Sequence, residues 1–250
     1  MSSFDRNREY YEALPPGRED YWRYMAAPRH RMARIKRLLA RIAPSSVVDL
    51  GCGNGQLLSE LHARWPHVRL AGVDLSAPRI EANRESIPEI EWICADLQQP
   101  VGGATAPLPQ EFDTVIASEI IEHLDNPTLL LSHARSFARQ DGHLILTTQS
   151  GPVRETERRV GHVRHFTRGE LWALLDGAGW TPLRAWNEGF PFHDLSKWWA
   201  NRDPGGSMER FGSKAYGLRQ RAVCAALRAA FAFNSSRRGA QLFALARRRR

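Results

Sequence analysis

Three acidic residues each lie at the end of a short apolar run, where a buried strand would end. Asp49 opens the run D-L-G-C-G-N-G, and its glycines at 51, 53 and 55 would let the backbone pass close to a ligand. At the end of the next run, Asp74 could accept hydrogen bonds from both hydroxyls of a ribose. Asp96, with the backbone N–H of Leu97, could read the edge of an adenine. Together these residues predict an adenosine-binding site.

The spacing of the glycines narrows the choice of ligand. A dinucleotide-binding loop follows the pattern G-x-G-x-x-G, whereas this turn reads G-x-G-x-G and has Gln56 where the third dinucleotide glycine would fall. The turn therefore favours an adenosyl ligand other than a nicotinamide dinucleotide.

A second set of candidate residues combines carboxylates and imidazoles. Glu119, Glu122 and His123 could share one face of a helix or tight turn, and His162 and His165 follow later, three residues apart. Such a set could bind a divalent cation or supply a general base. The alternatives are that the acids complement a helix dipole and that the two later histidines are ordinary loop side chains.

Short apolar runs alternate with amphipathic stretches after residue 44. Strands are expected at 47–50, 68–74, 91–96, 112–118 and 142–148, and helices at 56–65, 77–86, 128–138 and 168–178. This rhythm is typical of a doubly wound α/β fold with a Rossmann-like parallel sheet. Two more strands are expected at 181–188 and 240–247, separated by a helical insert at about 190–236.

The predicted organisation is therefore an N-terminal lid or helical segment, residues 1–44, followed by one α/β domain, residues 45–250. The N-terminal helix is expected to start at Pro28 and to end before Pro44.

Four motifs resemble those of class I S-adenosylmethionine-dependent methyltransferases. They are V-V-D-L-G-C-G-N-G at 47–55, G-V-D-L at 72–75, C-A-D-L at 94–97 and F-D-T-V-I-A-S at 112–118. The resemblance implies a seven-stranded, mostly parallel sheet with the last strand antiparallel and helices on both faces. It also implies S-adenosyl-L-methionine as the cofactor, bound by Asp49, Gly51, Gly53, Asp74, Leu75, Asp96, Leu97 and Ser118.

Within that resemblance each residue has an implied role. Gly51 and Gly53 line the methionine part of the cofactor, and Asp49 approaches its amino group through water. The carbonyl of Ser118 faces the same amino group.

The E-x-x-E-H segment is similar to that of ubiquinone-biosynthesis O-methyltransferases and of small-RNA 2′-O-methyltransferases. The resemblance implies Mg²⁺ or another divalent cation on Glu119, Glu122, His123 and either His162 or His165. We take His165 as the fourth ligand, and His123 and His165 as the candidate catalytic bases.

Aromatic residues on either side of the domain are candidate substrate contacts. We predict that Tyr21, Trp22, His162, Phe190 and His193 bind the substrate. A basic, apolar helix expected at 214–233 could contact a membrane surface peripherally, or pack on the sheet or on a second subunit as a homodimer.

Composition sets limits on the remaining possibilities. The net charge is +8, but four of these charges are the terminal run Arg247 to Arg250, so nucleic acid is a weaker expectation than a small molecule. The sequence has no transmembrane-length apolar run and no signal-peptide pattern, so a cytoplasmic protein is expected. Three widely spaced cysteines favour neither a disulfide framework nor a zinc site.

The sequence therefore predicts an enzyme of small-molecule biosynthesis that methylates a hydroxyl of a sugar, a quinone-type phenol or a natural product. Three alternatives remain open: an RNA 2′-O-methyltransferase, an N-methyltransferase acting on a small amine, and a non-catalytic cofactor-binding subunit.

Overall fold

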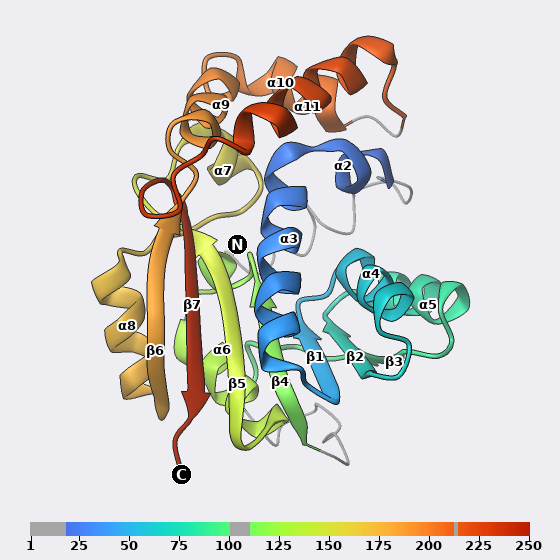
Figure 1. Cartoon of the computed structure of the whole chain (residues 1–250), viewed down its shortest axis with the longest axis vertical. Helices are drawn as coiled ribbons and strands as arrows, with labels where there is room; N and C mark the ends of the chain where they lie inside the picture. Colours follow the sequence, from blue (N-terminus) through green and yellow to red (C-terminus); the bar gives the residue numbers. More distant parts are fainter. Residues whose placement is uncertain (1–18, 101–110, 213–214) are drawn as a thin grey trace.

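A computed structural model describes residues 19–100, 111–212 and 215–250 (Figure 1). The strands are β1 (Ser46–Leu50), β2 (Arg69–Asp74), β3 (Glu91–Cys94), β4 (Phe112–Ser118), β5 (Ala138–Gln149), β6 (Trp180–Glu188) and β7 (Gln241–Arg248). The helices before β5 are α2 (Glu19–Tyr24), α3 (Ala26–Ile42), α4 (Gln56–Arg64), α5 (Ala77–Ser86), the 3₁₀ turn η1 (Ile121–His123) and α6 (Pro127–Phe137). Those after it are α7 (Glu155–Arg159), α8 (Arg168–Gly177), α9 (Phe192–Ala200), α10 (Pro204–Gly212) and α11 (Leu218–Phe231).

The strands form one seven-stranded sheet in the order β3-β2-β1-β4-β5-β7-β6. The first five strands are parallel, and β7 runs antiparallel between β5 and β6. The predicted Rossmann-like fold, with its antiparallel last strand and the helical insert before it, is confirmed.

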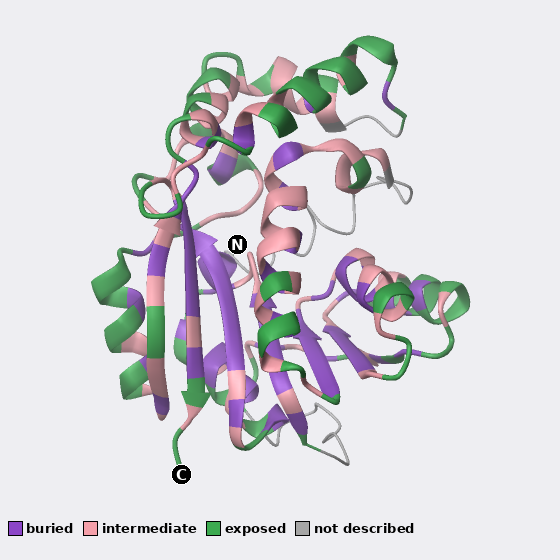
Figure 2. Ribbon diagram, viewed as in Figure 1, coloured by how far each residue is buried: buried purple, intermediate pink, exposed green. Residues whose placement is uncertain are grey.

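Neighbouring side chains on the central strands enter different cores, because successive residues of a strand face opposite sides of the sheet. On β1, Val47 packs with Ile35 and Leu39 of α3, whereas Val48 belongs to the core beneath α6 and α8. Burial of both faces explains why these strands read as continuous apolar runs (Figure 2).

The strand order reverses at β1, which lies between β2 and β4. In open α/β sheets ligands bind at such a switch point, outside the carboxyl ends of the strands. The glycine turn follows β1, and the segment beginning at Glu119 follows β4. The topology therefore brings the two sets of predicted functional residues to adjacent strand ends.

The N-terminal helix is part of the sheet's covering layer. It starts at Ala26, two residues before the expected start at Pro28, and its apolar side packs against Val47, Ile116 and Ile145. A lid role for this part of the chain stays a prediction, and the first 18 residues of the predicted segment lie outside the described residues.

The insert between β6 and β7 forms three helices, α9 to α11, which Figure 1 shows grouped beyond the end of β5 and beside the start of α3. The helix expected at 214–233 is shorter, Leu218–Phe231, and Lys214 lies outside the described residues. Across the three described segments, no helix is long and apolar enough to cross a membrane.

Candidate functional site

The turn between β1 and α4 has a left-handed backbone at each of its three glycines. Their φ angles are +76° at Gly51, +55° at Gly53 and +69° at Gly55. The amides of Gly51 and Cys52 both donate to the carbonyl of Val73 on β2, at 2.8 and 3.0 Å, which holds the turn at the edge of the sheet. Non-glycine residues adopt this conformation at a cost, so the glycines are needed for the path of the turn.

Asp74 and Asp96 lie where the sequence predicts, at or just beyond successive strand ends. Asp74 accepts from the amides of Gly53 at 2.8 Å and Ser76 at 2.9 Å, so its carboxylate is fixed directly beside the turn. Asp96 accepts from the amide of Gln98 at 2.8 Å. Leu75 follows Asp74 and is half-buried, whereas Leu97 is buried.

Asp49 is buried, and its Oδ1 has no hydrogen-bond partner among the described residues. Burial raises the pKa of this carboxyl to about 8, the charge of Asp74 adds to the increase, and Arg31 opposes it. An ammonium group nearby would supply the missing countercharge. The orphaned oxygen therefore suits the amino group of the predicted cofactor.

The segment after β4 lies directly against this turn. A Cβ atom added to Gly51 would lie 2.5 Å from Cδ1 of Ile120, so the side chain of Ile120 packs against the turn as closely as a glycine allows. Ser118 bonds Thr147 through its hydroxyl at 3.0 Å, and Glu119 takes a left-handed φ of +54° before the single 3₁₀ turn η1.

The two glutamates are held by different side chains of β5. Glu119 accepts from Gln149 Nε2 at 2.6 Å and Thr147 Oγ1 at 3.2 Å, and lies 3.4 Å from Arg31. Glu122 accepts from Thr148 Oγ1 at 2.9 Å. Because Thr147 and Thr148 alternate across the strand, the two carboxylates are directed to opposite sides of β5, not to the single face that a helix would give.

The electrostatics of the two acids also differ. Burial alone would raise the pKa of Glu119, but Arg31 and Gln149 outweigh it and the pKa is lowered. Burial and the charge of Glu119 raise the pKa of Glu122 well above its ordinary value. Its Oε1 is buried and has no hydrogen-bond partner within the described part of the chain.

Glu122, His123 and His162 bring potential ligand atoms within 4.8 Å of one another. Burial lowers the pKa of His123 to about 4 and that of His162 to about 2, so both rings are neutral at physiological pH. The group does not include Glu119 or His165, although both lie nearby.

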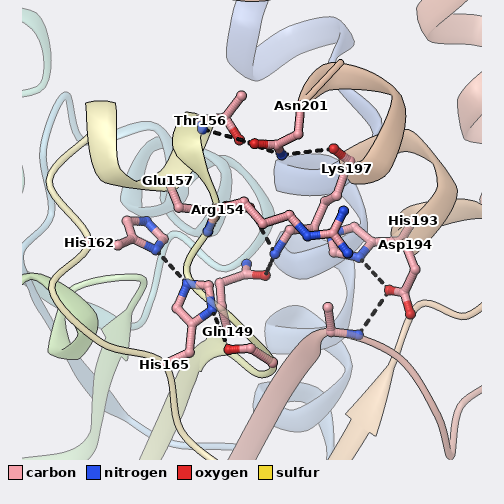
Figure 3. Close-up of polar contacts among 12 residues, drawn as sticks. Gln149, Arg154, Thr156, Glu157, His162, His165, His193, Asp194, Lys197 and Asn201 are labelled. Carbon is pink, nitrogen blue, oxygen red and sulfur yellow. Dashed lines mark hydrogen bonds and ion pairs between the residues drawn. The ribbon is translucent and has the colours of Figure 1, made fainter. Parts of the chain in front are cut away.

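Hydrogen bonds define how His162 presents its ring (Figure 3). Nδ1 of His165 lies 3.0 Å from the carbonyl of Gly151, which can only accept, so Nδ1 carries the proton. Nε2 of the neutral His165 then accepts from Nδ1 of His162 at 2.9 Å. This arrangement leaves Nε2 of His162 unprotonated. Of the two later histidines, His162 can therefore offer a lone pair, and His165 orients it.

The other predicted substrate contacts are not members of the group formed by Glu122, His123 and His162. His193 is buried against Phe231, with ring centroids 5.7 Å apart, and its Nδ1 is 3.2 Å from Asp194. Phe190 is half-exposed at the start of the insert. Tyr21 and Trp22 pack edge to face on α2. Their roles in substrate binding stay predictions.

The structure adds two cations that the sequence reasoning missed, Arg31 and Lys197. Lys197 of α9 donates to Gln149 Oε1 at 3.0 Å and lies 3.1 Å from Glu157 (Figure 3). Arg31 influences both Asp49 and Glu119, so it lies between the cofactor turn and the acidic segment. Both come from helices far away in sequence, and only their position in the fold identifies them.

Comparisons with known proteins identify the family of the chain. A family model described as a methyltransferase domain matches residues 21–185. Trans-aconitate 2-methyltransferase of Azoarcus sp. strain BH72 is 32% identical over 130 residues, covering 51% of this chain and 49% of the relative. Malonyl-[acyl-carrier protein] O-methyltransferase of Anoxybacillus flavithermus is 26% identical over 180 residues, 70% of this chain and 62% of the relative. The chain thus spans about half the length of several curated relatives that it matches.

Two solved structures share the fold over nearly their whole length. The N-methyltransferase NodS of Bradyrhizobium japonicum WM9, in complex with S-adenosyl-L-homocysteine, has a TM-score of 0.59 and 17% identity, covering 97% of this chain and 98% of that one. The plantazolicin methyltransferase BamL has a TM-score of 0.59 and 15% identity, covering 99% and 98%.

The fold and the matching family model identify a class I S-adenosylmethionine-dependent methyltransferase domain. Within that class, the chain belongs to the methyltransferase-domain family whose model matches residues 21–185.

Proposed function

We propose that this chain transfers the methyl group of S-adenosylmethionine to an oxygen atom of a small molecule, with a divalent cation at Glu122, His123 and His162. The observation that carries the proposal is the group formed by half-buried His162 with buried Glu122 and His123, which closely follow Ile120, the residue that packs against the cofactor turn. The name of one relative, trans-aconitate 2-methyltransferase, supports a small acceptor, and that of another, an O-methyltransferase, supports transfer to oxygen.

The donor set fits a cation. Glu122 has a buried oxygen with no hydrogen-bond partner among the described residues, and a cation would offset the desolvation of this carboxylate. His162 has too low a pKa to be an effective general base near neutral pH, but a neutral imidazole is the form that binds a metal. Two imidazoles and one carboxylate favour a first-row transition metal such as Mn²⁺, Fe²⁺ or Zn²⁺ over Mg²⁺.

The chemistry needs little from the protein beyond alignment and proton removal, because the sulfonium is already activated. A bound cation would lower the pKa of an acceptor hydroxyl. The chain's own residues position the reactants: Asp74 and the glycine turn hold the cofactor, and His165 fixes the tautomer of His162. Lys197 and Arg31 provide positive charge around Glu119, which would attract an acceptor that carries an anionic group.

The alternative of an RNA acceptor loses its support from the basic terminus. Arg249 is paired with Asp176 and donates to the carbonyl of Trp180, and Arg250 lies 3.3 Å from Asp141. Because β7 is antiparallel, these arginines lie at the opposite edge of the sheet from the strand ends that hold the site (Figure 1).

The first prediction concerns the cation. The purified chain, freed of metal by a chelator, is titrated with Mn²⁺, Zn²⁺ and Mg²⁺, and bound metal is measured by calorimetry and elemental analysis. Glu122→Gln should weaken Mn²⁺ or Zn²⁺ binding about 10- to 100-fold, because it removes the only carboxylate of the group. Glu155→Gln, which changes a half-exposed acid paired with Arg159, should leave binding unchanged. Equal binding by the two variants would rule out the assigned site.

Methyl transfer is tested separately. The metal-loaded chain is incubated with labelled S-adenosylmethionine and either a pool of small hydroxylated and carboxylated molecules or short RNAs. Label in the ester or ether fraction of the small-molecule pool is the expected result. Label only in RNA, or only in N-methyl products, would contradict the proposed acceptor, and undiminished transfer by the metal-free chain would contradict a role for the cation.

A further inference from the structure

We infer that the outer face of the insert is a docking surface for an anionic lipid membrane. We call this surface the insert face and define it by the exposed side chains of Phe190, Leu195, Trp198, Trp199, Leu218, Arg219, Ala222, Val223, Ala225, Arg228, Ala229 and Phe233. None of the contacts assigned above to the cofactor turn or to the Glu122 group involves these side chains.

Large apolar side chains are unusually concentrated on the insert face. Of the ten large hydrophobic residues that are exposed in the described chain, seven lie between Phe190 and Phe233. Leu218 is 86% exposed, Phe233 78% and Trp199 65%. Single exposed apolar residues need no explanation, but a cluster of this kind marks an interaction site.

The helix α11 turns an apolar stripe outward. Its inner side buries Cys224 and Phe231, which contact Met25 at the start of α3, His30 of α3 and His193 of α9. The opposite side carries residues at helical spacing, all of them exposed: Leu218, Ala222, Ala225 and Ala229. The exposed residues of α11 also include Arg219, Arg221 and Arg228, so its solvent side combines apolar and basic side chains. This combination is typical of a helix that lies in a membrane interface.

The segment that forms the insert is also basic, and some of its arginines lie on or beside the insert face. Residues 190–240 contain nine Lys and Arg against three Asp and Glu, so they carry +6 of the chain's net charge of +8. Arg219 and Arg228 lie on α11 with no ion pair to any residue within the described ranges. Arg202 stacks over Trp198, 4.3 Å from the ring centroid. This excess charge complements a surface of anionic lipid headgroups.

Together, these features favour a membrane over two other occupants. A second copy of the chain would bring two equally positive faces together, which costs electrostatic repulsion. A nucleic acid would use the arginines and tryptophans but would gain little from Leu195, Leu218 and Val223, because bases stack on flat rings. A bilayer interface interacts favourably with all three types of side chain found here, which are aromatic, aliphatic and arginine side chains.

Helix α9 connects the insert face to the candidate site. On α9, Leu195 and Trp199 face outward, whereas Lys197 and the following Asn201 bond Gln149 and Thr156 (Figure 3). A membrane bound to the insert face would therefore lie one helix away from the acidic segment. If the proposed methyl transfer holds, an acceptor with a lipophilic portion would be presented to the site from the bilayer; membrane binding itself does not depend on that proposal.

Vesicle co-sedimentation of the full chain tests this inference. We expect binding to vesicles of phosphatidylcholine mixed with phosphatidylglycerol, weaker binding to phosphatidylcholine alone, and a decrease at high salt. The double variant Leu195→Ser/Trp199→Ser should lower the partition coefficient about tenfold, and Arg219→Ser/Arg228→Ser by a similar factor on anionic vesicles only.

Matched controls lie outside the insert. Trp172→Ser and Arg168→Ser change an exposed tryptophan and an exposed arginine of α8, and should bind vesicles like the unchanged chain. Circular dichroism and the thermal shift with S-adenosylmethionine verify that every variant is folded.

Three results would overturn the inference: no binding to either vesicle, an equal loss in the α8 controls, or a stable dimer in sedimentation velocity that the insert variants dissociate. None of these readouts depends on methyl transfer, so they are independent of the proposed function.

Discussion

Asp49 is a carboxylate that the fold buries without a fixed countercharge. It lies beside Asp74 and has one oxygen without a partner among the described residues. Burial and the neighbouring charge therefore hold its pKa near 8 in the protein without cofactor. A binding residue of this kind stores unfavourable energy in the empty site, which a cationic ligand releases when it binds.

The pH dependence of stability follows from this shift. The folded pKa of Asp49, about 8, exceeds the unfolded value of 3.8, so its contribution to folding is complete below pH 3.8 and is lost as the pH rises to 8. Asp49→Asn removes this loss. In urea unfolding without cofactor, we expect the variant to be more stable than the unchanged chain by about 1–3 kcal/mol at pH 8. At pH 6 the gain in stability should be smaller.

The same substitution should weaken S-adenosylmethionine binding about tenfold or more, because the ammonium loses its charged partner. Asp125→Asn, an exposed acid, is the control for both measurements. A variant that is less stable than the unchanged chain at pH 8 would show that Asp49 is not the destabilised group.

The sequence was sufficient to predict those site residues that follow a recognisable local pattern. The glycines and Asp49, Asp74 and Asp96 follow apolar runs, so their type and position along the chain suffice. The distinction between His162 and His165 could not be made, because it depends on the carbonyl of Gly151, to which only one of the two rings bonds.

At the scale of elements, the turn between β1 and α4 depends on the segment after β4. Gly51 has a φ of +76° and faces Ile120, two residues before Glu122. Gly51→Ala should cost about 1–3 kcal/mol through backbone strain and overpacking, and should weaken cofactor binding because Ile120 must move. Differential scanning calorimetry and a cofactor titration measure both effects.

A glycine in a relaxed helix is the matched control. Gly177 lies at the end of α8, and a Cβ added there would meet no atom within 4 Å. Gly177→Ala should be neutral or stabilising by up to about 1 kcal/mol, because alanine is less flexible than glycine in the unfolded chain. Equal destabilisation by both substitutions would show that the close approach to Ile120 is not the cause.

Most elements could be predicted because their apolar patterns are long and regular. A difference of four residues occurs at β5, which begins at Ala138 instead of residue 142, because Ala138 pairs with Phe112 across an irregularity in the ladder to β4. The helices of the insert were harder to delimit. Their apolar residues face both inward and outward, so periodicity alone does not define a single buried side.

At the scale of the whole molecule, the candidate site lies at one end of the sheet and the terminal arginines at the other, and one strand connects the two ends. Cofactor turn, acidic segment and insert lie at the carboxyl ends of the parallel strands, whereas the terminal arginines lie at the other edge (Figure 1). The strand β7 runs the full distance between these ends. It is hydrogen-bonded to β5 on one side and to β6 on the other.

The stability of the molecule should therefore depend on β7 far more than on the arginines that follow it. Deleting residues 241–250 would leave β5 and β6 without their shared partner and would remove the buried side chains of Leu242, Phe243 and Ala246. Each large apolar side chain contributes about 1.5–3 kcal/mol, and total stabilities are about 5–15 kcal/mol, so the truncated chain should not fold.

Deleting only residues 249–250 removes surface ion pairs worth about 0–1 kcal/mol each. Circular dichroism and urea unfolding distinguish the two. A folded chain that lacks β7 would contradict the central position of this strand, and unfolding of the shorter deletion would show that the terminal arginines, not the strand, hold this edge of the sheet together.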